Sequence, residues 1–347
     1  MAAVPGHPRR HDLPLFAGTE DTEDIFLTTM MELDKEIVNE LKVDHPLWEY
    51  LQDKNLIKYQ SDISTDITFP ILDKPNSTVK DFTAYDDADL TPQDALSEAR
   101  FLWGHIAGTQ MYNREEMVKN SGKYKLIDLV ETKTLQLKES LNNHFAEKLI
   151  GNQDTDGRVI MGIGRILTKD AVCGGINPTD TGFGYWNPQV ILKDSDTEPE
   201  SKAQVKYDLA TEYRPAMRKL RRDCTTNKMS PDVYFMGEDV WDKHAEFVEA
   251  KSVVQLSPEQ AEKFGGYEML IDNGRFYMYE ENLPPKTVWA LNFKNRGVEL
   301  RIHKDTNFSF QPWENTSGKI QTKHRHCLLY ATVVCRKRNI NGLLEFQ

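Results

Sequence analysis

The densest group of potential metal ligands lies near the C-terminus, in the stretch Lys323-His324-Arg325-His326-Cys327. On a β-strand successive side chains point to opposite faces, so His324 and His326 share one face while Cys327 points to the other. A tetrahedral zinc site needs its ligands to converge on one point. The spacing therefore does not support a three-ligand site, and we predict no metal and no other cofactor.

Other stretches match catalytic or nucleotide-binding motifs only in part. Residues 161–164 (MGIG) lack the third glycine of GxGxxG, and no clear strand precedes them, so a structural turn is favoured. Gly318-Lys319 lacks the upstream glycine and the hydroxyl residue of a phosphate-binding loop. No GxSxG or HExxH motif is present, and His244 lies beside Trp241 and Phe247, as a packed histidine would. We predict no catalytic or cofactor-binding residue, and we expect the chain not to be an enzyme.

The composition is that of a folded protein that does not bind nucleic acid tightly over its whole surface. The 347 residues are 39% hydrophobic and 28% charged, with a formal net charge of −11. The basic run 218–222 falls on the polar side of a predicted helix, where we expect a solvated face. The four cysteines form no CxxC pair and are predicted to be reduced, packed thiols. No apolar run reaches the ~20 residues of a membrane span, and no signal-type apolar segment is present, so we expect synthesis in a cytoplasm.

One long amphipathic helix is predicted from about Tyr124 to Ile150. At 1.5 Å per residue it would be roughly 40 Å long and would need a large surface to lie along. Gly151 follows as a residue suited to ending a helix. The apolar side chains recur every three or four positions: Ile127, Val130, Thr134, Leu137, Leu141, Phe145 and Leu149.

The region before this helix has an unusual organisation. A flexible arm and a modest helix at about 23–41 are followed by Asp66–Ile71, which alternates like a strand and contains Pro70, so an edge position is expected. Residues 72–99 are polar and acidic, with too few apolar side chains for a core of their own. A stretch of this length in a folded chain is usually functional. Residues 101–108 are predicted to be a returning strand.

The sequence after Gly151 predicts a mixed α/β region followed by strands. A second helical stripe runs over 209–224, and residues 269–278 form a predicted hairpin around Asn273-Gly274. Four strands are expected in the tail: 288–293, 298–302, 308–310 and 328–334.

The order of these parts resembles the major capsid proteins of tailed double-stranded DNA phages, which have the Hong Kong ninety-seven fold. The likeness spans roughly residues 23–347. No single motif in it is specific to the family, so the resemblance depends on the whole set occurring in this order. The stretches that carry it are LWEYL (47–51), ITFPI (67–71), EEMVKNSG (115–122), LIDL (126–129), GIGRIL (162–167), CGGI (173–176), WNP (186–188), MSPDV (229–233) and LPPKTVW (283–289).

This resemblance implies an α+β fold with an N-terminal arm, an extended β-hairpin loop, a peripheral domain with a long spine helix, and an axial α/β domain. The implied ranges are 1–57 for the arm, 58–112 for the extended loop, 113–155 for the peripheral domain with its spine helix, 156–292 for the axial domain, and 293–347 for the return strands of the peripheral domain.

The resemblance also implies a function. The chain is expected to self-assemble as hexamers and pentamers into an icosahedral virion shell that encloses DNA with weak contact, in the cytoplasm of a host bacterium and without a membrane. Only about sixty residues precede the loop, too few for a built-in scaffold, so a separate scaffolding protein is implied. A portal protein is a further implied partner, and a decoration protein is a candidate partner. In one branch of the family the subunits are covalently cross-linked through a lysine and an asparagine. Neither residue can be matched in this sequence, so the resemblance does not imply cross-linking here.

Three alternatives remain at this point. An encapsulin-like nanocompartment is the nearest, and its gene neighbours would include a cargo enzyme in place of a terminase and portal. A cytosolic hydrolase or transferase would need a deep pocket in a compact subunit, against which the long coreless loop argues. A DNA-binding protein conflicts with the net charge of −11.

Overall fold

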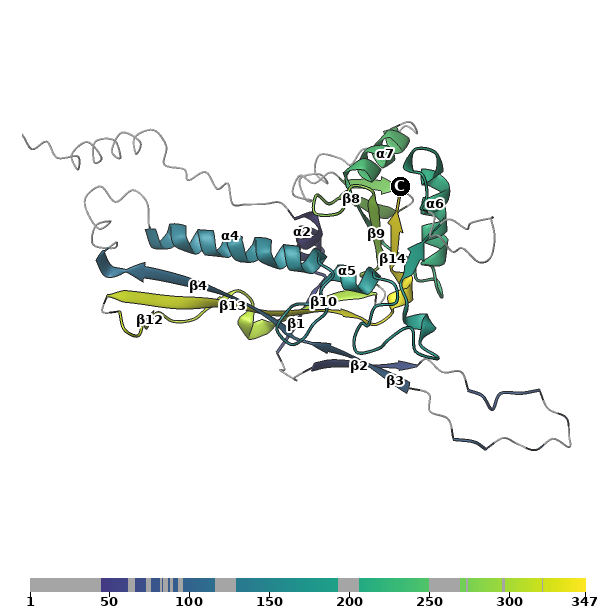
Figure 1. The fold of residues 1–347 in the computed structure, drawn as a ribbon, viewed down its shortest axis with the longest axis horizontal. Helices are drawn as coiled ribbons and strands as arrows, with labels where there is room; N and C mark the ends of the chain where they lie inside the picture. Colours follow the sequence, from purple (N-terminus) through teal and green to yellow (C-terminus); the bar gives the residue numbers. More distant parts are fainter. Residues whose placement is uncertain are drawn as a thin grey trace, which may run out of the picture.

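The structure is a computed structural model, shown in Figure 1. It describes residues 45–347 except 62–65, 73–75, 82, 84–86, 88–89, 93–95, 116–128, 193–205, 250–268, 273, 295–296 and 320. The predicted arm and the predicted helix at 23–41 lie outside the described residues.

A six-stranded sheet forms one half of the body, and β13 (Thr322–Cys335) is its longest strand. Antiparallel pairing joins β13 to β10 on one side and to β4 along ten residue pairs on the other, while β1 pairs parallel with β10. The other strands are β1 (Ile57–Gln60), β4 (Gly104–Asn113), β10 (Val298–His303), β11 (Ser309–Phe310) and β12 (Glu314–Asn315).

The helix α4 (Leu129–Ile150) lies along this sheet, over β4 (Figure 1). Its 22 residues correspond to about 33 Å of helix. Leu141, Phe145 and Leu149 are buried, as the helical stripe predicts, and Leu137 is half-buried. The strand leaves room for them, because a Cβ at Gly108 would lie 2.6 Å from Leu137 Cδ1. The expected first turn at 124–128 lies outside the described residues.

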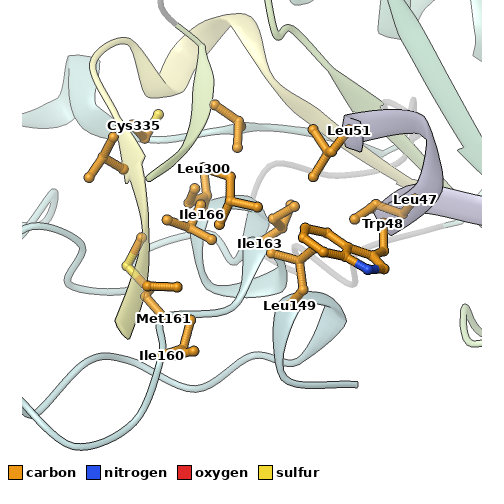
Figure 2. Packing of buried hydrophobic residues seen from close by; sticks show 14 of the residues in the cluster. Leu47, Trp48, Leu51, Leu149, Ile160, Met161, Ile163, Ile166, Leu300 and Cys335 are labelled. Carbon is orange, nitrogen blue, oxygen red and sulfur yellow. The ribbon is translucent and has the colours of Figure 1, made fainter. Parts of the chain in front are cut away.

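The short helix α2 (Pro46–Asp53) closes one end of the core. Trp48 packs edge-on against Phe145 of α4, with ring centroids 4.8 Å apart. The carboxylate of Glu280 accepts a hydrogen bond from the Leu47 N–H at 2.9 Å, which satisfies a free donor in the first turn of the helix. Figure 2 shows α2 meeting the end of α4, the helix α5 (Ile163–Leu167) and the sheet in one apolar cluster. Residues 46–53 therefore belong to the core, although the sequence placed them in the arm.

A second six-stranded sheet, in the order β5-β14-β9-β6-β8-β7, forms the other half of the body. Its strands are β5 (Gln189–Ile191), β6 (Val233–Met236), β7 (Met269–Asp272), β8 (Arg275–Tyr279), β9 (Thr287–Leu291) and β14 (Gly342–Glu345). Helices α6 (Leu209–Asp223) and α7 (Glu238–Glu249) lie beside it (Figure 1). Its last strand, β14, comes from the range 293–347, so the prediction that this whole range returns to the first sheet needs correction.

The third sheet is a two-stranded ribbon of β2 (Asp66–Leu72) and β3 (Leu96–Leu102). It lies on the side of the first sheet away from α4 (Figure 1). The flanking strands β1 and β4 belong to the first sheet, because each pairs there along its whole length. The ribbon is accordingly shorter than the loop range 58–112 expected from sequence.

Several local predictions are confirmed. The 269–278 hairpin forms as β7 and β8, with Gly274 at φ +73°, and all four predicted tail strands are present. The four cysteines are free and buried. Mixed helix and sheet content confirms the α+β class. None of the described helices is both long and apolar enough to cross a membrane.

Candidate functional site: the ribbon and its root

The β2–β3 ribbon is the candidate site because its two ends have opposite environments. Its register runs from Asp66 opposite Leu102 to Leu72 opposite Leu96, and among the described residues neither strand pairs with any other. Pro70 has no N–H to donate to a neighbouring strand. Because β2 pairs only with β3, it is an edge strand, and the predicted edge position of Pro70 is confirmed. We call the end nearest Asp66 and Leu102 the root, and the end at Leu72 and Leu96 the outer part.

The root is packed into the body, whereas the outer part is exposed. Phe101 and Ala99 are fully buried. Leu72 is 75% exposed and Leu96 59% exposed. Farther along the chain, Val79 is 81% and Leu90 is 88% exposed. Large apolar side chains this exposed commonly mark interaction surfaces when they gather in one region.

Two arginines hold the root against the first sheet. The guanidinium carbon of Arg336 lies 4.4 Å from the centroid of the Phe69 ring, and that of Arg301 lies 4.9 Å from it. Phe69 in turn contacts Phe101, with centroids 6.2 Å apart. Each cation–π contact of this kind contributes about 0.5–2 kcal/mol, depending on desolvation.

Glu299 of β10 is the buried counter-charge of these arginines. Its side chain is 5% exposed and lies 2.8 Å from Lys58 Nζ, 3.3 Å from Arg301 and 3.4 Å from Arg336. Burial acts to raise the pKa of Glu299, but the hydrogen bonds from Lys58 and Arg301 and the charges of Arg336 and Lys58 outweigh it. The pKa therefore lies below its ordinary value, and Glu299 stays ionised beneath the ribbon.

A glycine turn receives the buried ring of the ribbon. Gly174 has φ +61°, and a Cβ there would lie 2.7 Å from Phe101 Cζ, so only glycine fits both the backbone and the ring. The Arg100 N–H donates to the Gly174 carbonyl at 2.8 Å, and the Arg100 side chain forms an ion pair with Asp66 across the ribbon. The root is thus tied to the turn at 173–176 by packing and by backbone hydrogen bonding.

Arg338 organises the loops behind that turn. It is 1% exposed, and its guanidinium donates to the carbonyls of Ile166 and Ala171 at 2.7 Å each. Three further carbonyls accept from it, those of Arg165, Thr168 and Trp186. Burial lowers the pKa of Arg338 from its ordinary value. In the sequence Arg338 is only one residue of the basic run 336–338. The one feature that could have indicated its burial is that this run directly follows an apolar strand.

A cavity of about 470 Å³ lies between the ribbon and the body. The ribbon contributes residues 69–72 to it, and the body contributes Tyr185, Trp186, Met229 and residues 336–339. Its lining is mainly aromatic and aliphatic, and residues 336–339 add polar and charged groups. The arrangement offers surface for protein contact, and it brings together no set of catalytic groups among the described residues.

The motif residues singled out in the sequence lie elsewhere. His324 and His326 are neighbours on β13 with ring centroids 5.2 Å apart, whereas Cys327 is fully buried. Within the described part of the chain, no three His, Cys, Asp or Glu side chains are arranged to hold a metal ion. His244 is packed, as predicted: it is 3% exposed, its Nδ1 lies 2.6 Å from the Tyr213 hydroxyl, and burial lowers its pKa to about 4.

Two further sequence interpretations are confirmed. Residues 161–164 are structural, because a Cβ at Gly162 would lie 1.8 Å from the Gly151 carbonyl oxygen, at the close approach of α5 to the end of α4. In the basic run of α6, Arg218, Arg221 and Arg222 are exposed on the polar face of the helix.

Comparison with known proteins shows a likeness in structure but not in sequence. No protein-family model and no curated protein sequence matches the chain. The cyanophage A-1(L) capsid subunit is similar over 90% of this chain and 95% of its own, with a TM-score of 0.61 and 13% identity. The capsid of Myoviridae phage XM1 is similar over 90% and 96%, with a TM-score of 0.56 and 12% identity.

A non-viral shell protein also matches. The SrpI encapsulin of Synechococcus elongatus PCC 7942 is similar over 92% of this chain and 94% of its own, with a TM-score of 0.54 and 9% identity. All three matches cover at least nine-tenths of this chain and of the other chain, so the likeness extends over most of the fold. The chain therefore has the Hong Kong ninety-seven fold of tailed-phage major capsid proteins.

Proposed function

We propose that the chain is the major capsid protein of a tailed double-stranded DNA phage and that it assembles as hexamers and pentamers into a closed shell. The observation that carries the proposal is the combination of this fold over nine-tenths of the chain with a ribbon whose outer apolar side chains are exposed in the single subunit. Such side chains gain burial when a second subunit covers them. The role is structural and non-enzymatic.

Each part of the fold has a place in this proposal. The first sheet with α4 is the peripheral domain, and the second sheet with α6 and α7 is the axial domain, whose neighbours meet around a symmetry axis. The β2–β3 ribbon is the base of the extended loop, which reaches over a neighbouring subunit.

The partners follow from the same role. The net charge of −11 suits a shell that encloses DNA with weak contact, because a lining that bound phosphate strongly would impede packing and release. A separate scaffolding protein would direct closure, a portal protein would occupy one vertex, and a decoration protein is a further candidate. The proposed location is the virion, after assembly in the cytoplasm of a bacterial host.

The second candidate is an encapsulin-like nanocompartment shell, which the similarity to the SrpI encapsulin favours. The two functions differ in what the shell encloses and in what helps it close. A phage shell would need a scaffold and would take up DNA through a portal, whereas a nanocompartment would close alone around a tagged enzyme.

The test is electron microscopy of the purified chain, expressed alone and together with its neighbouring genes. Closed shells of uniform diameter that package DNA support the capsid proposal, and closed shells around a co-purified enzyme support the nanocompartment. A monomer or small oligomer under all conditions would overturn both.

A deletion locates the assembly surface within this experiment. Removal of residues 76–96 is expected to leave a folded subunit that forms no closed shells, because the described residues of this segment are mostly exposed and, in the proposed capsid, the loop contacts the neighbouring subunit. Ile271→Ser is a control for the loss of exposed apolar surface elsewhere, since Ile271 is also an exposed apolar residue but lies on β7, the edge strand of the second sheet. Closed shells from the deletion variant would show that the loop assignment is wrong.

A further inference from the structure

The helices α6 and α7 form one layer on the second sheet. They cover the same face of that sheet, because Leu220 of α6, Val240 of α7 and Tyr277 of β8 belong to one buried cluster. The Tyr213 hydroxyl lies 2.6 Å from His244 Nδ1, in a hydrogen bond that joins α6 to α7. The two helices therefore present their exposed charged side chains on one fixed surface.

One end of this layer is basic, and it lies where α6 meets the C-terminal part of α7. The guanidinium carbon of Arg214 lies 4.3 Å from the centroid of the Phe247 ring. Arg214, Arg218 and Arg221 line a cavity of about 160 Å³, and all three are exposed. Within the described part of the chain none of them forms an ion pair with a carboxylate. Asp272 also lines the cavity, but three guanidinium groups outnumber one carboxylate, so this basic end keeps an excess of positive charge.

The other end of the layer is acidic, and it lies at the first turns of α7. Burial raises the pKa of the Tyr279 hydroxyl, and the negative charges of four nearby carboxylates raise it further: Glu238, Glu281, Glu280 and Asp242. Glu280 is buried and accepts a hydrogen bond from α2, whereas the other three are exposed. These three form no ion pair among the residues that the structure describes, and we call them the acidic end.

The two ends are too far apart to neutralise each other within one subunit. Glu238 and Phe247 are nine positions apart on α7, which corresponds to about 14 Å along its axis. Between exposed charges, this distance exceeds the Debye length of about 8 Å at physiological ionic strength. Each end therefore has its charge available for a partner outside the subunit.

We propose that the basic end of one subunit binds the acidic end of a second copy of the chain, so that successive subunits join head to tail around an axis. A second copy fits because it carries the complementary surface itself. Such a contact is heterologous, and a suitable rotation between copies closes it into a ring. Complementary charges at its rim fix the register and disfavour like-charged surfaces. This inference rests on the proposed function, for which it names the residues of the contact between axial domains.

The test is the yield of closed shells from charge-reversed full chains in the assembly experiment above. Arg218→Glu/Arg221→Glu should lower the yield at least about tenfold, because like charges then face each other across the contact. Asp242→Lys/Glu281→Lys should lower it to the same extent from the other side. All four substitutions in one chain restore opposite charges, so the yield should return to within about twofold of that of the unmodified chain. No recovery in this combined variant would overturn the pairing of the two ends.

Arg221→Glu and Arg222→Glu are a matched pair of single variants. Both arginines are exposed on α6, but only Arg221 lines the cavity, so only its reversal should reduce the yield. Equal yields from the two variants would overturn the inference. If a reversed chain fails to fold by circular dichroism, the charge-removing variant Arg218→Gln/Arg221→Gln decides, and an unchanged yield from it counts against the contact.

Two further outcomes separate this inference from its alternatives. Closed shells from the unmodified chain and from every reversed chain would overturn the inference and leave the proposed function standing, whereas no assembly of the unmodified chain would overturn both. The four carboxylates of residues 194–200, which lie outside the described residues, are another candidate partner for the arginines. If their replacement by amides lowers the yield while Asp242→Lys/Glu281→Lys does not, the acidic end is not the partner and the inference is wrong.

Discussion

The two ends of the β2–β3 ribbon are built from similar apolar residues but have opposite surroundings. At the root, Phe101 is fully buried against Gly174, and Phe69 lies under two guanidinium groups. At the outer part, Leu72 and Leu96 form the last pair of the same ladder and are 75% and 59% exposed. The two environments are only three residues apart along β2, from Phe69 to Leu72, and five residues apart along β3, from Leu96 to Phe101.

This difference separates what the subunit needs for its own stability from what it offers to others. Burial of an apolar side chain stabilises the fold in proportion to the area removed from water, so the root contributes within one chain and the outer part contributes little. In the proposed capsid, the outer part becomes stabilising only when a neighbour covers it. Substitutions at the two ends should therefore change different measurements.

The largest effect is expected at the buried ring of the root. Phe101→Ala should lower the free energy of unfolding by about 3–5 kcal/mol, because it removes a fully buried ring and leaves a cavity beside Gly174. Urea-induced unfolding of the subunit measures it. The matched control is Leu96→Ala in the same strand, and an equal loss of stability from both variants would show that root and outer part do not differ.

A somewhat smaller loss is expected behind the root. Arg338→Met should cost roughly 3 kcal/mol, because a similar volume is kept while five carbonyls lose their guanidinium donor. Arg222→Met, at an exposed position of α6, should stay within about 0.5 kcal/mol of the unmodified chain. Thermal unfolding of the two variants side by side tests this, and similar melting temperatures would contradict the role of Arg338.

The charge cluster of the root should add a pH dependence. The folded-state pKa of Glu299 lies below its ordinary value of 4.5, so its contribution is fully present above pH 4.5 and is lost as the pH falls through the lowered pKa. Glu299→Gln should cost about 1–2 kcal/mol at pH 7, and the difference from the unmodified chain should shrink in acid. Unfolding curves between pH 7 and pH 3 measure it; a difference that stays constant with pH would argue against an ionised Glu299.

The smallest effect on stability is expected at the outer part. The double variant Leu72→Ser/Leu96→Ser should change the free energy of unfolding by less than about 0.5 kcal/mol, because both side chains are already exposed. The same variant should reduce the yield of closed shells in the assembly experiment. A normal yield of shells would show that Leu72 and Leu96 are not part of the assembly surface. A large loss of stability would show that these side chains are buried within the subunit.

The sequence anticipated features that depend on local periodicity. The stripe of α4, the 269–278 hairpin, the tail strands and the edge position of Pro70 all follow from spacing along a single segment. The ranges at domain borders were less accurate: α2 joins the core, β1 and β4 join the first sheet, and β14 joins the second. The sheet to which a strand belongs is decided by its pairing with distant segments. The spacing of residues within one segment carries no information about that pairing.

The sequence by itself determined the order of elements, the coreless acidic stretch and the absence of recognised catalytic motifs, because each of these is a property of neighbouring residues. Only the tertiary structure decided that Arg338 is buried while Arg222 is exposed, and that Glu299 meets Lys58, 241 positions earlier in the chain. The physical reason is that burial and charge pairing depend on which distant segments pack together. Two arginines with the same chemistry therefore act as an internal support in one place and as a solvated surface in the other.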